Sequence, residues 1–181
     1  DFGDLSTTAR SGVVGAGSDT RGLFAGGESP KTTSIEYITI NTTGNASSFG
    51  VLSSARKGGG ATSDKTKAVF MGGESAETNM DYVTSTFGTL SQGSYGGHCG
   101  TISNGTRGIF AIGGSSASGN YNTKIVYKTI ATTANATDFG TLSQGRSDGG
   151  QVGDSTRGAF GGGKYTSGGT SGVTTIDYIT I

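Results

Sequence analysis

The sequence lacks several features on which common classes of protein depend. Cys99 is the one cysteine among 181 residues, so no disulfide can form within the chain and a disulfide-stapled secreted scaffold is excluded. Thirteen Lys and Arg balance thirteen Asp and Glu. Without a cationic excess, nucleic acid is not expected as the main partner. No apolar run approaches the roughly 18 residues of a membrane-spanning helix, so membrane insertion is not expected either.

Signals for helices are also missing. No segment has apolar residues at the 3.6-residue spacing of an amphipathic helix, and no capping box precedes an apolar run. The sequence has no signal peptide and begins at Asp1 rather than Met, which indicates a trimmed start or one domain of a longer product. The absence of helix signals predicts an all-β fold.

Glycine and internal repetition are what the chain has in abundance. Its 36 glycines recur in register with aromatic and aliphatic residues, which favours turns and tight strand packing over disorder. A short apolar run with an aromatic residue, opened by a cation and closed by a glycine pair, occurs four times. The copies are residues 21–27, 67–73, 107–114 and 157–163. Four copies indicate a repeat architecture.

Two more motifs recur with the same period. Phe-Gly-x-Leu-Ser (Phe2-Gly3-Asp4-Leu5-Ser6 in the first copy) occupies residues 2–6, 49–53, 87–91 and 139–143, and a β-branched run around a tyrosine occupies 35–40, 80–84, 125–130 and 176–181. Alternating residues of these types favour half-buried strands. Each unit therefore predicts four antiparallel strands: glycine-rich strand a, strand b with the glycine pair, strand c with the tyrosine, and strand d with Phe-Gly-x-Leu-Ser. Glycine in strand a suits a narrow place near a common axis.

Four-stranded units spaced about 45 residues apart are typical of β-propeller blades. We predict a single domain over residues 1–181 with units at about 10–53, 56–91, 94–143 and 146–181 plus 1–6. The chain opens on a strand d and stops on a strand c, so the N-terminal strand is expected to complete the last sheet and close a four-bladed ring. A longer array, or two chains closing a larger ring, are the alternatives.

The repeat resembles the kelch repeat over nearly the whole chain. The first unit has Arg10-Ser11-Gly12, then Phe24 before Gly26-Gly27, then Glu36-Tyr37, then Phe49 on the last strand. Phe stands where kelch repeats usually have Trp, and the third unit has Ser94-Tyr95 in place of the opening arginine found at Arg10, Arg56 and Arg146. The resemblance implies a kelch-like propeller, although kelch rings usually have more blades.

The Asn-Ala-(Ser/Thr)-x-Phe-Gly phrasing and the Thr-, Ser- and Gly-rich loops also resemble repeat arrays of structural proteins in marine tailed phages. This resemblance implies a component of the virion surface, such as a fibre or an adhesin. The expected location is accordingly the virion surface or the extracellular space.

Candidate chemistry is sparse. His98 and Cys99 are neighbours on a predicted strand, so their side chains point to opposite faces and cannot form a nucleophile–base pair. Acids at the predicted a–b turns are expected to form the turns rather than to bind calcium (Asp19, Asp64 and Asp154). Four N-x-S/T triplets, at Asn41, Asn45, Asn104 and Asn135, are interpreted as chance occurrences in turns. No catalytic residue, metal ligand or cofactor is predicted, and an enzyme is the weakest hypothesis.

The variable b–c loops are the candidate binding surface. They span residues 28–34, 74–79, 115–124 and 164–175, and a rigid scaffold with variable loops commonly carries a binding site. The candidate ligand-binding residues are Tyr121, Lys124, Lys164 and Tyr165 on the two longest loops, with Arg10, Arg56, Tyr95 and Arg146 on the adjoining d–a face. They suit a cell-surface glycan or protein receptor. The alternatives are assembly with neighbouring virion subunits, or loops whose lengths drift without function.

The cations that open the b strands recur in every unit, which indicates an architectural role (Arg21, Lys67, Arg107 and Arg157). We expect them to pair with the turn acids just before them and to position neighbouring blades, although surface pairs of this kind contribute little individually.

Overall fold

The protein is an all-β molecule in the computed structural model, which describes residues 1–6, 9–74, 77–82, 85–94, 100–115, 120–165 and 171–181. Within these ranges the ordered elements are β-strands and no helix occurs, so none could cross a membrane. The strands form four antiparallel sheets of three or four strands and one short two-stranded ribbon. The predicted fold class is therefore confirmed at this level.

The four sheets follow the four sequence repeats. The first contains β1 (Val14–Gly17), β2 (Arg21–Ala25), β3 (Ser34–Thr39) and β4 (Ser47–Val51), and the second contains β5 (Gly60–Ser63), β6 (Ala68–Met71), β7 (Glu77–Tyr82) and β8 (Ser85–Ser94). The third contains β9 (Thr101–Ser103), β10 (Arg107–Ala111), β13 (Lys124–Thr129) and β14 (Thr137–Thr141), with the ribbon β11 (Gly114–Ser115) and β12 (Asn120–Tyr121) inserted between β10 and β13. The fourth contains β15 (Gly150–Gly153), β16 (Arg157–Gly161) and β17 (Ile176–Thr180).

The a–b turns are fixed by side chains that accept backbone hydrogen bonds. Between β15 and β16, the Asp154 carboxylate accepts the N–H groups of Thr156 and Arg157 at 2.7 and 2.8 Å. Asp64 does the same for the turn between β5 and β6, as does the side-chain oxygen of Asn104 before β10. The predicted turn-forming role of Asp64 and Asp154 is confirmed.

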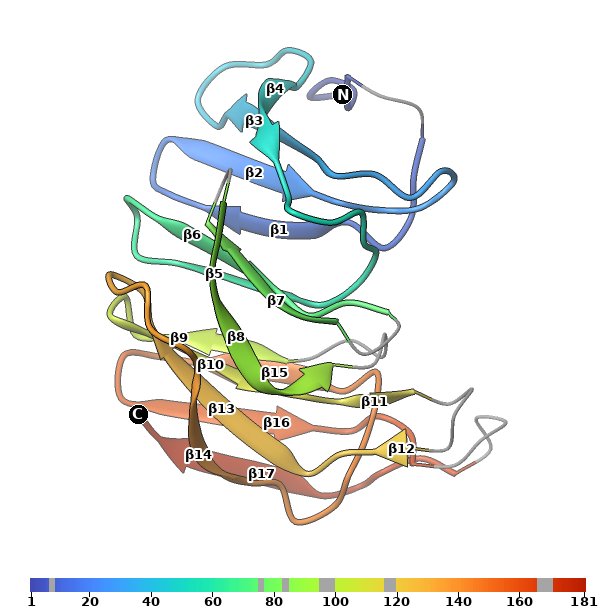
Figure 1. Ribbon diagram of the computed structural model, residues 1–181, viewed down its shortest axis with the longest axis vertical. Helices are drawn as coiled ribbons and strands as arrows, with labels where there is room; N and C mark the ends of the chain where they lie inside the picture. Colours follow the sequence, from blue (N-terminus) through green and yellow to red (C-terminus); the bar gives the residue numbers. More distant parts are fainter. Residues whose placement is uncertain (7–8, 75–76, 83–84, 95–99, 116–119, 166–170) are drawn as a thin grey trace.

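The sheets lie one after another, and their hydrophobic cores lie between them. Their first strands adjoin in the order β1, β5, β9 and β15 (Figure 1). A Cβ on Gly60 would lie only 2.4 Å from the Thr101 side chain, and one on Gly153 equally close to Ile102. Glycine in the first strand therefore permits close approach of neighbouring sheets. Three separate apolar clusters fill the three junctions, centred on Phe70, Phe110 and Phe160.

The N-terminal segment does not complete the fourth sheet, which differs from the prediction. Residues 1–6 contain no strand and lie against the first sheet, where the N–H groups of Gly44 and Ala46 donate to the Phe2 and Asp4 carbonyls, both at 2.8 Å. The fourth sheet has three strands, and the two termini lie at opposite ends of the row of sheets (Figure 1). The segment satisfies its backbone polar groups on the sheet nearest to it in sequence.

Candidate functional site

The three arginines predicted to bind a ligand are all buried in ion pairs. Arg10 meets Glu36 at 2.9 Å, Arg56 pairs with Asp81, and Arg146 pairs with Asp177. In each case the acid lies on the third strand of the sheet that the arginine precedes.

Arg56 and Arg146 also hold the same backbone groups in their repeats. Arg56 donates to the carbonyls of Gly72 and Asn79 at 3.1 and 3.0 Å, and Arg146 donates to those of Gly162 and Thr175 at 3.3 and 3.0 Å. Desolvation lowers the pKa of Arg56, and the neighbouring acids oppose this change. The structure thus places all three arginines in the interior, where Arg56 and Arg146 tie the glycine pair to the third strand.

The third repeat has lost both halves of this ion pair. Val126 occupies the position of Glu36, Asp81 and Asp177, and it is fully buried. The sequence contains no arginine from residue 57 to 106. Removing one partner of a buried pair leaves an uncompensated charge, whereas replacing both is tolerated. This joint loss is the sequence signal that identifies the arginines as structural.

Of the four candidate residues on the long loops, two lysines are held in ion pairs, one tyrosine has a buried hydroxyl, and one tyrosine is exposed. Lys124 pairs with Asp138 at 3.1 Å and Lys164 with Asp148 at 2.6 Å. The hydrogen bond from Lys164 to Asp148 raises the pKa of Lys164, and the nearby Tyr121 contributes in the same direction. The Tyr121 hydroxyl is buried without a hydrogen-bond partner, whereas Tyr165 is exposed.

The structure therefore brings Tyr121 and Lys164 together, but it leaves no free cation on this face at Lys124 or Lys164. Tyr95, His98 and Cys99 lie outside the described residues.

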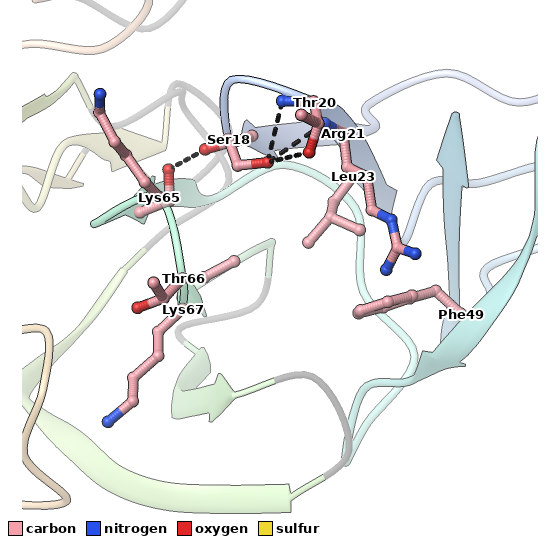
Figure 2. Close-up of a pocket in the computed structure, with 11 residues that line it drawn as sticks. Ser18, Thr20, Arg21, Leu23, Phe49, Lys65, Thr66 and Lys67 are labelled. Carbon is pink, nitrogen blue, oxygen red and sulfur yellow. Dashed lines mark hydrogen bonds between the residues drawn. The ribbon is translucent and has the colours of Figure 1, made fainter. Parts of the chain in front are cut away.

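A pocket of about 340 Å³ opens elsewhere, between the first and second sheets at their a–b turns (Figure 2). One wall is the turn that leads into β2, with Ser18, Thr20 and Arg21, and the other is the turn that leads into β6. The apolar floor and the second wall comprise Leu23, Phe49, Ala68, Lys65, Thr66 and Lys67.

Packing and hydrogen bonds organise the first wall of this pocket. The Arg21 guanidinium lies 5.0 Å from the centre of the Tyr37 ring, and that ring meets Phe49 edge-on at 5.7 Å. The Ser18 hydroxyl accepts the N–H groups of Thr20 and Arg21. The cation and the aromatic floor are thus held before any ligand arrives, which reduces the ordering cost of binding.

The second wall contributes two more cations. Lys65 forms an exposed ion pair with Asp19 across the mouth at 3.1 Å, and the Lys67 ammonium donates to the Ala131 carbonyl at 3.4 Å. A carbonyl does not neutralise an ammonium, and an exposed pair such as Lys65–Asp19 contributes little energy. Two acids lie at these turns: Asp19, which pairs with Lys65, and Asp64, which accepts backbone N–H groups and interacts electrostatically with Lys67. Three cations against two acids leave a positive excess, so the pocket suits an anionic group.

Sequence reasoning missed this pocket because it expects Arg21 and Lys67 to pair with the turn acids just before them. Arg21 stacks on Tyr37 and Arg107 stacks on Tyr127 at 5.1 Å, while the carboxylates of Asp64 and Asp154 accept backbone N–H groups. The available signal was Lys65 and Lys67, which give the second turn one cation more than the other turns.

No protein-family model matches the chain, and no curated protein matches it at significant similarity. Across the described ranges, no three His, Cys, Asp or Glu side chains gather closely enough to hold a metal ion.

Proposed function

We propose that the protein is a non-enzymatic binding module that recognises an acidic cell-surface glycan in the pocket between its first two sheets. The observation that carries this proposal is a single pocket that has an aromatic floor and is lined by three cationic residues, Arg21, Lys65 and Lys67. The sequence placed a binding surface on the b–c loops. The excess of cations around the pocket favours the a–b turns instead.

The lining matches the chemistry of a sugar that bears a carboxylate or sulfate. Hydroxyl groups of Ser18, Thr20 and Thr66 can exchange hydrogen bonds with sugar hydroxyls, and Phe49 offers an apolar surface to a pyranose ring. The cations supply charge-assisted hydrogen bonds to the acidic group, which are the stronger kind.

The architecture that we propose for this module is four kelch-like blades of a β-propeller, carried on a virion or another extracellular surface as an adhesin. The four repeats, each with one antiparallel sheet, and the adjoining glycine-rich first strands support this arrangement. Both resemblances noted in the sequence agree with such a role.

Titration with a uronate-containing tetrasaccharide and with a neutral tetrasaccharide of equal length tests the function. We expect the acidic sugar to bind more tightly, with an affinity that falls as salt rises. The double variant Lys65→Gln/Lys67→Gln should lose at least about tenfold in affinity, or about 1.4 kcal/mol. Lys31→Gln, which changes an exposed lysine outside the pocket, is the matched control. Equal binding of the two sugars, or equal loss in the control, contradicts the proposal.

The alternative function is a structural component of a virion or fibre that docks to neighbouring subunits. One observation favours it: the fourth sheet exposes large apolar side chains on its outer face.

A further inference from the structure

The outer face of the fourth sheet is apolar and uncovered. Val152, Ile176 and Tyr178 are 72, 74 and 77% exposed. The residues equivalent to Ile176 in the first three repeats are Ile35, Met80 and Ile125, which are 0, 0 and 1% exposed because the following sheet covers them. The fourth sheet thus keeps the residues of a junction without the sheet that would occupy it.

The first sheet also has an uncovered face, the one that a preceding sheet covers in the other three repeats. Phe24 is only half-buried, although its equivalents Phe70, Phe110 and Phe160 are all buried against the preceding sheet. An apolar cavity of about 300 Å³ lies on this face, lined by Phe2, Gly3, Asp4, Leu5, Val13, Phe24 and Ile38. Seven large hydrophobic side chains are exposed among the described residues, and five belong to these two faces: Phe2, Ile40, Val152, Ile176 and Tyr178.

The junction between the third and fourth sheets shows how two such faces fit. Ile102 and Ile109 of the third sheet pack against Phe160, with Leu142 at the end of the last strand, and Ile179 packs at the margin. By repeat position, Val152 and Ala159 are equivalent to the two isoleucines. Phe24, Leu5 and Ile38 are equivalent to Phe160, Leu142 and Ile179. The two uncovered faces therefore carry the two halves of a junction that the molecule already forms internally.

The N-terminal segment occupies the place of a fourth strand that belongs to a preceding sheet. Its Ser6 hydroxyl donates to the Glu36 carboxylate, as the Ser53 N–H donates to Asp81 at 3.1 Å and the Ser143 N–H to Asp177 at 2.9 Å. Ser53 and Ser143 each follow the last strand of the preceding sheet. The fourth sheet has no fourth strand, and Tyr178 has no ring partner among the described residues. In contrast, Tyr127 meets Phe139 edge-on at 6.1 Å.

The surroundings of the glycine pair also differ between the first and the fourth repeats. In the first repeat, the Gly27 N–H donates to the Arg56 carbonyl at 2.8 Å, and a Cβ on Gly26 would lie 2.4 Å from that oxygen. Gly162, the equivalent of Gly26, has nothing within 4 Å of the position of a Cβ. No backbone group of a following repeat therefore packs on Gly162, as the Arg56 carbonyl packs on Gly26.

We propose that the outer face of the fourth sheet binds the first sheet of a second copy of this chain, head to tail. The N-terminal segment of that copy adds along β17 as its fourth strand, and Phe2 meets Tyr178. Two copies that dock at both ends place eight sheets in one ring, within the range of four to eight blades typical of closed propellers. This inference deepens the structural alternative, and it does not depend on the glycan pocket.

Disulfide trapping between two single-cysteine variants of the full chain tests the docking. In a Cys99→Ser background, Phe2→Cys and Tyr178→Cys are purified separately, mixed and oxidised. The expected result is a covalent species of twice the 18.0 kDa mass of one chain in the mixture, and much less of it in either variant alone. A mixture that stays uncross-linked, while the double variant Phe2→Cys/Tyr178→Cys forms the bond within one chain, overturns the proposal in favour of a ring closed by a single copy.

Light scattering with a surface variant provides an independent measurement. We expect the unmodified chain to have at least twice the mass of one copy, and Ile176→Asp to have the mass of one copy with an unchanged circular dichroism spectrum. Val51→Asp changes an exposed apolar residue outside both faces and should leave the mass unchanged. A monomeric unmodified chain, or equal masses for the two variants, overturns the proposal. Sugar titration of Ile176→Asp separates this result from the glycan proposal, because the pocket is unaltered.

Discussion

Arg56 and Asp81 form a buried ion pair that joins the start of the second repeat to the third strand of its sheet. The same guanidinium donates to the carbonyls of Gly72 and Asn79. Arg10 with Glu36 and Arg146 with Asp177 repeat the pairing, and the third repeat replaces it with the buried Val126. The same position on the third strand therefore holds the acid of an ion pair in three repeats and an apolar side chain in the other.

Breaking this pair on one side should cost more than replacing both sides. Asp81→Ala leaves the Arg56 charge buried without its acid, and we expect a loss of about 3–5 kcal/mol in the free energy of unfolding. The double variant Arg56→Met/Asp81→Val imitates the third repeat and should lose clearly less. Urea unfolding followed by circular dichroism measures both. If the double variant were as unstable as Asp81→Ala, the ion pair would not be the reason for the cost.

The turn acids should make the fold sensitive to acid. The backbone N–H groups of Thr156 and Arg157 and the Thr156 hydroxyl hold the pKa of Asp154 below its ordinary value. For Asp64, desolvation pushes the pKa up, but hydrogen bonds from Thr66 and Lys67 outweigh it, and the pKa is again lowered.

A carboxyl group with a lowered folded-state pKa contributes stability above its unfolded pKa, about 3.9, and that contribution is lost as pH falls through the folded-state value. The double variant Asp64→Asn/Asp154→Asn keeps an acceptor at each turn, as Asn104 does before β10. We expect nearly unchanged stability at pH 7 and a weaker loss between about pH 4 and pH 2. Thermal unfolding across this range measures it, and an unaltered acid profile would refute the assignment.

Lys128 should oppose folding at neutral pH. It is buried where the first and fourth repeats have Ile38 and Ile179, and desolvation lowers its pKa. A lysine with a lowered folded-state pKa makes the fold more stable as pH rises toward the unfolded value, about 10.4. The Lys128 ammonium donates to the carbonyl and the hydroxyl of Thr132, and Lys128→Met removes these bonds together with the charge. We expect Lys128→Met to lose the alkaline gain, measured by urea unfolding from pH 7 to 9.5. Lys31→Met is the exposed control. If Lys128→Met still became more stable as pH rose from 7 to 9.5, Lys128 would not be the source of this pH dependence.

Two glycines at the same repeat position should respond differently to alanine. Gly26 and Gly162 have φ angles of 67° and 68°, which cost an L-residue about 1–2 kcal/mol. The Cβ of Gly26→Ala would also collide with the Arg56 carbonyl, whereas that of Gly162→Ala meets nothing within 4 Å. We expect Gly26→Ala to lose a further ~1–3 kcal/mol from this overpacking. Melting temperatures of the two variants, measured on protein diluted to the monomer, test the difference.

Most of the fold could be predicted from sequence because its determinants are local. The alternation around Tyr37, the glycine pair after Phe24 and the turn acids each act within one repeat, so strands and turns were predicted at the right places. The position of residues 2–6 was not predictable, because their motif fits a fourth strand equally well in any sheet. Their contacts with Gly44 and Ala46 depend on which sheet lies nearby.

The candidate site was predicted less well, because burial decides what a charged side chain does. Arg10, Arg56 and Arg146 look like surface cations in sequence, yet the sheets enclose them with an acid. Recurrence in every unit indicates an architectural role for Arg21, yet this residue also lines the pocket. The pocket depends on two turns from different repeats, and no property of either turn alone predicts how they face each other.

The placement of the hydrophobic cores between sheets, rather than inside them, has a consequence for how the molecule opens. Each sheet draws stability from the sheets that adjoin it, so cooperativity passes along the row from one neighbour to the next. The second and third sheets have neighbours on both sides, and the fourth has one. In protein diluted to the monomer, amide protons of β15 and β17 should therefore exchange with solvent before those of β6 and β10, so that the C-terminal sheet unfolds before the middle sheets.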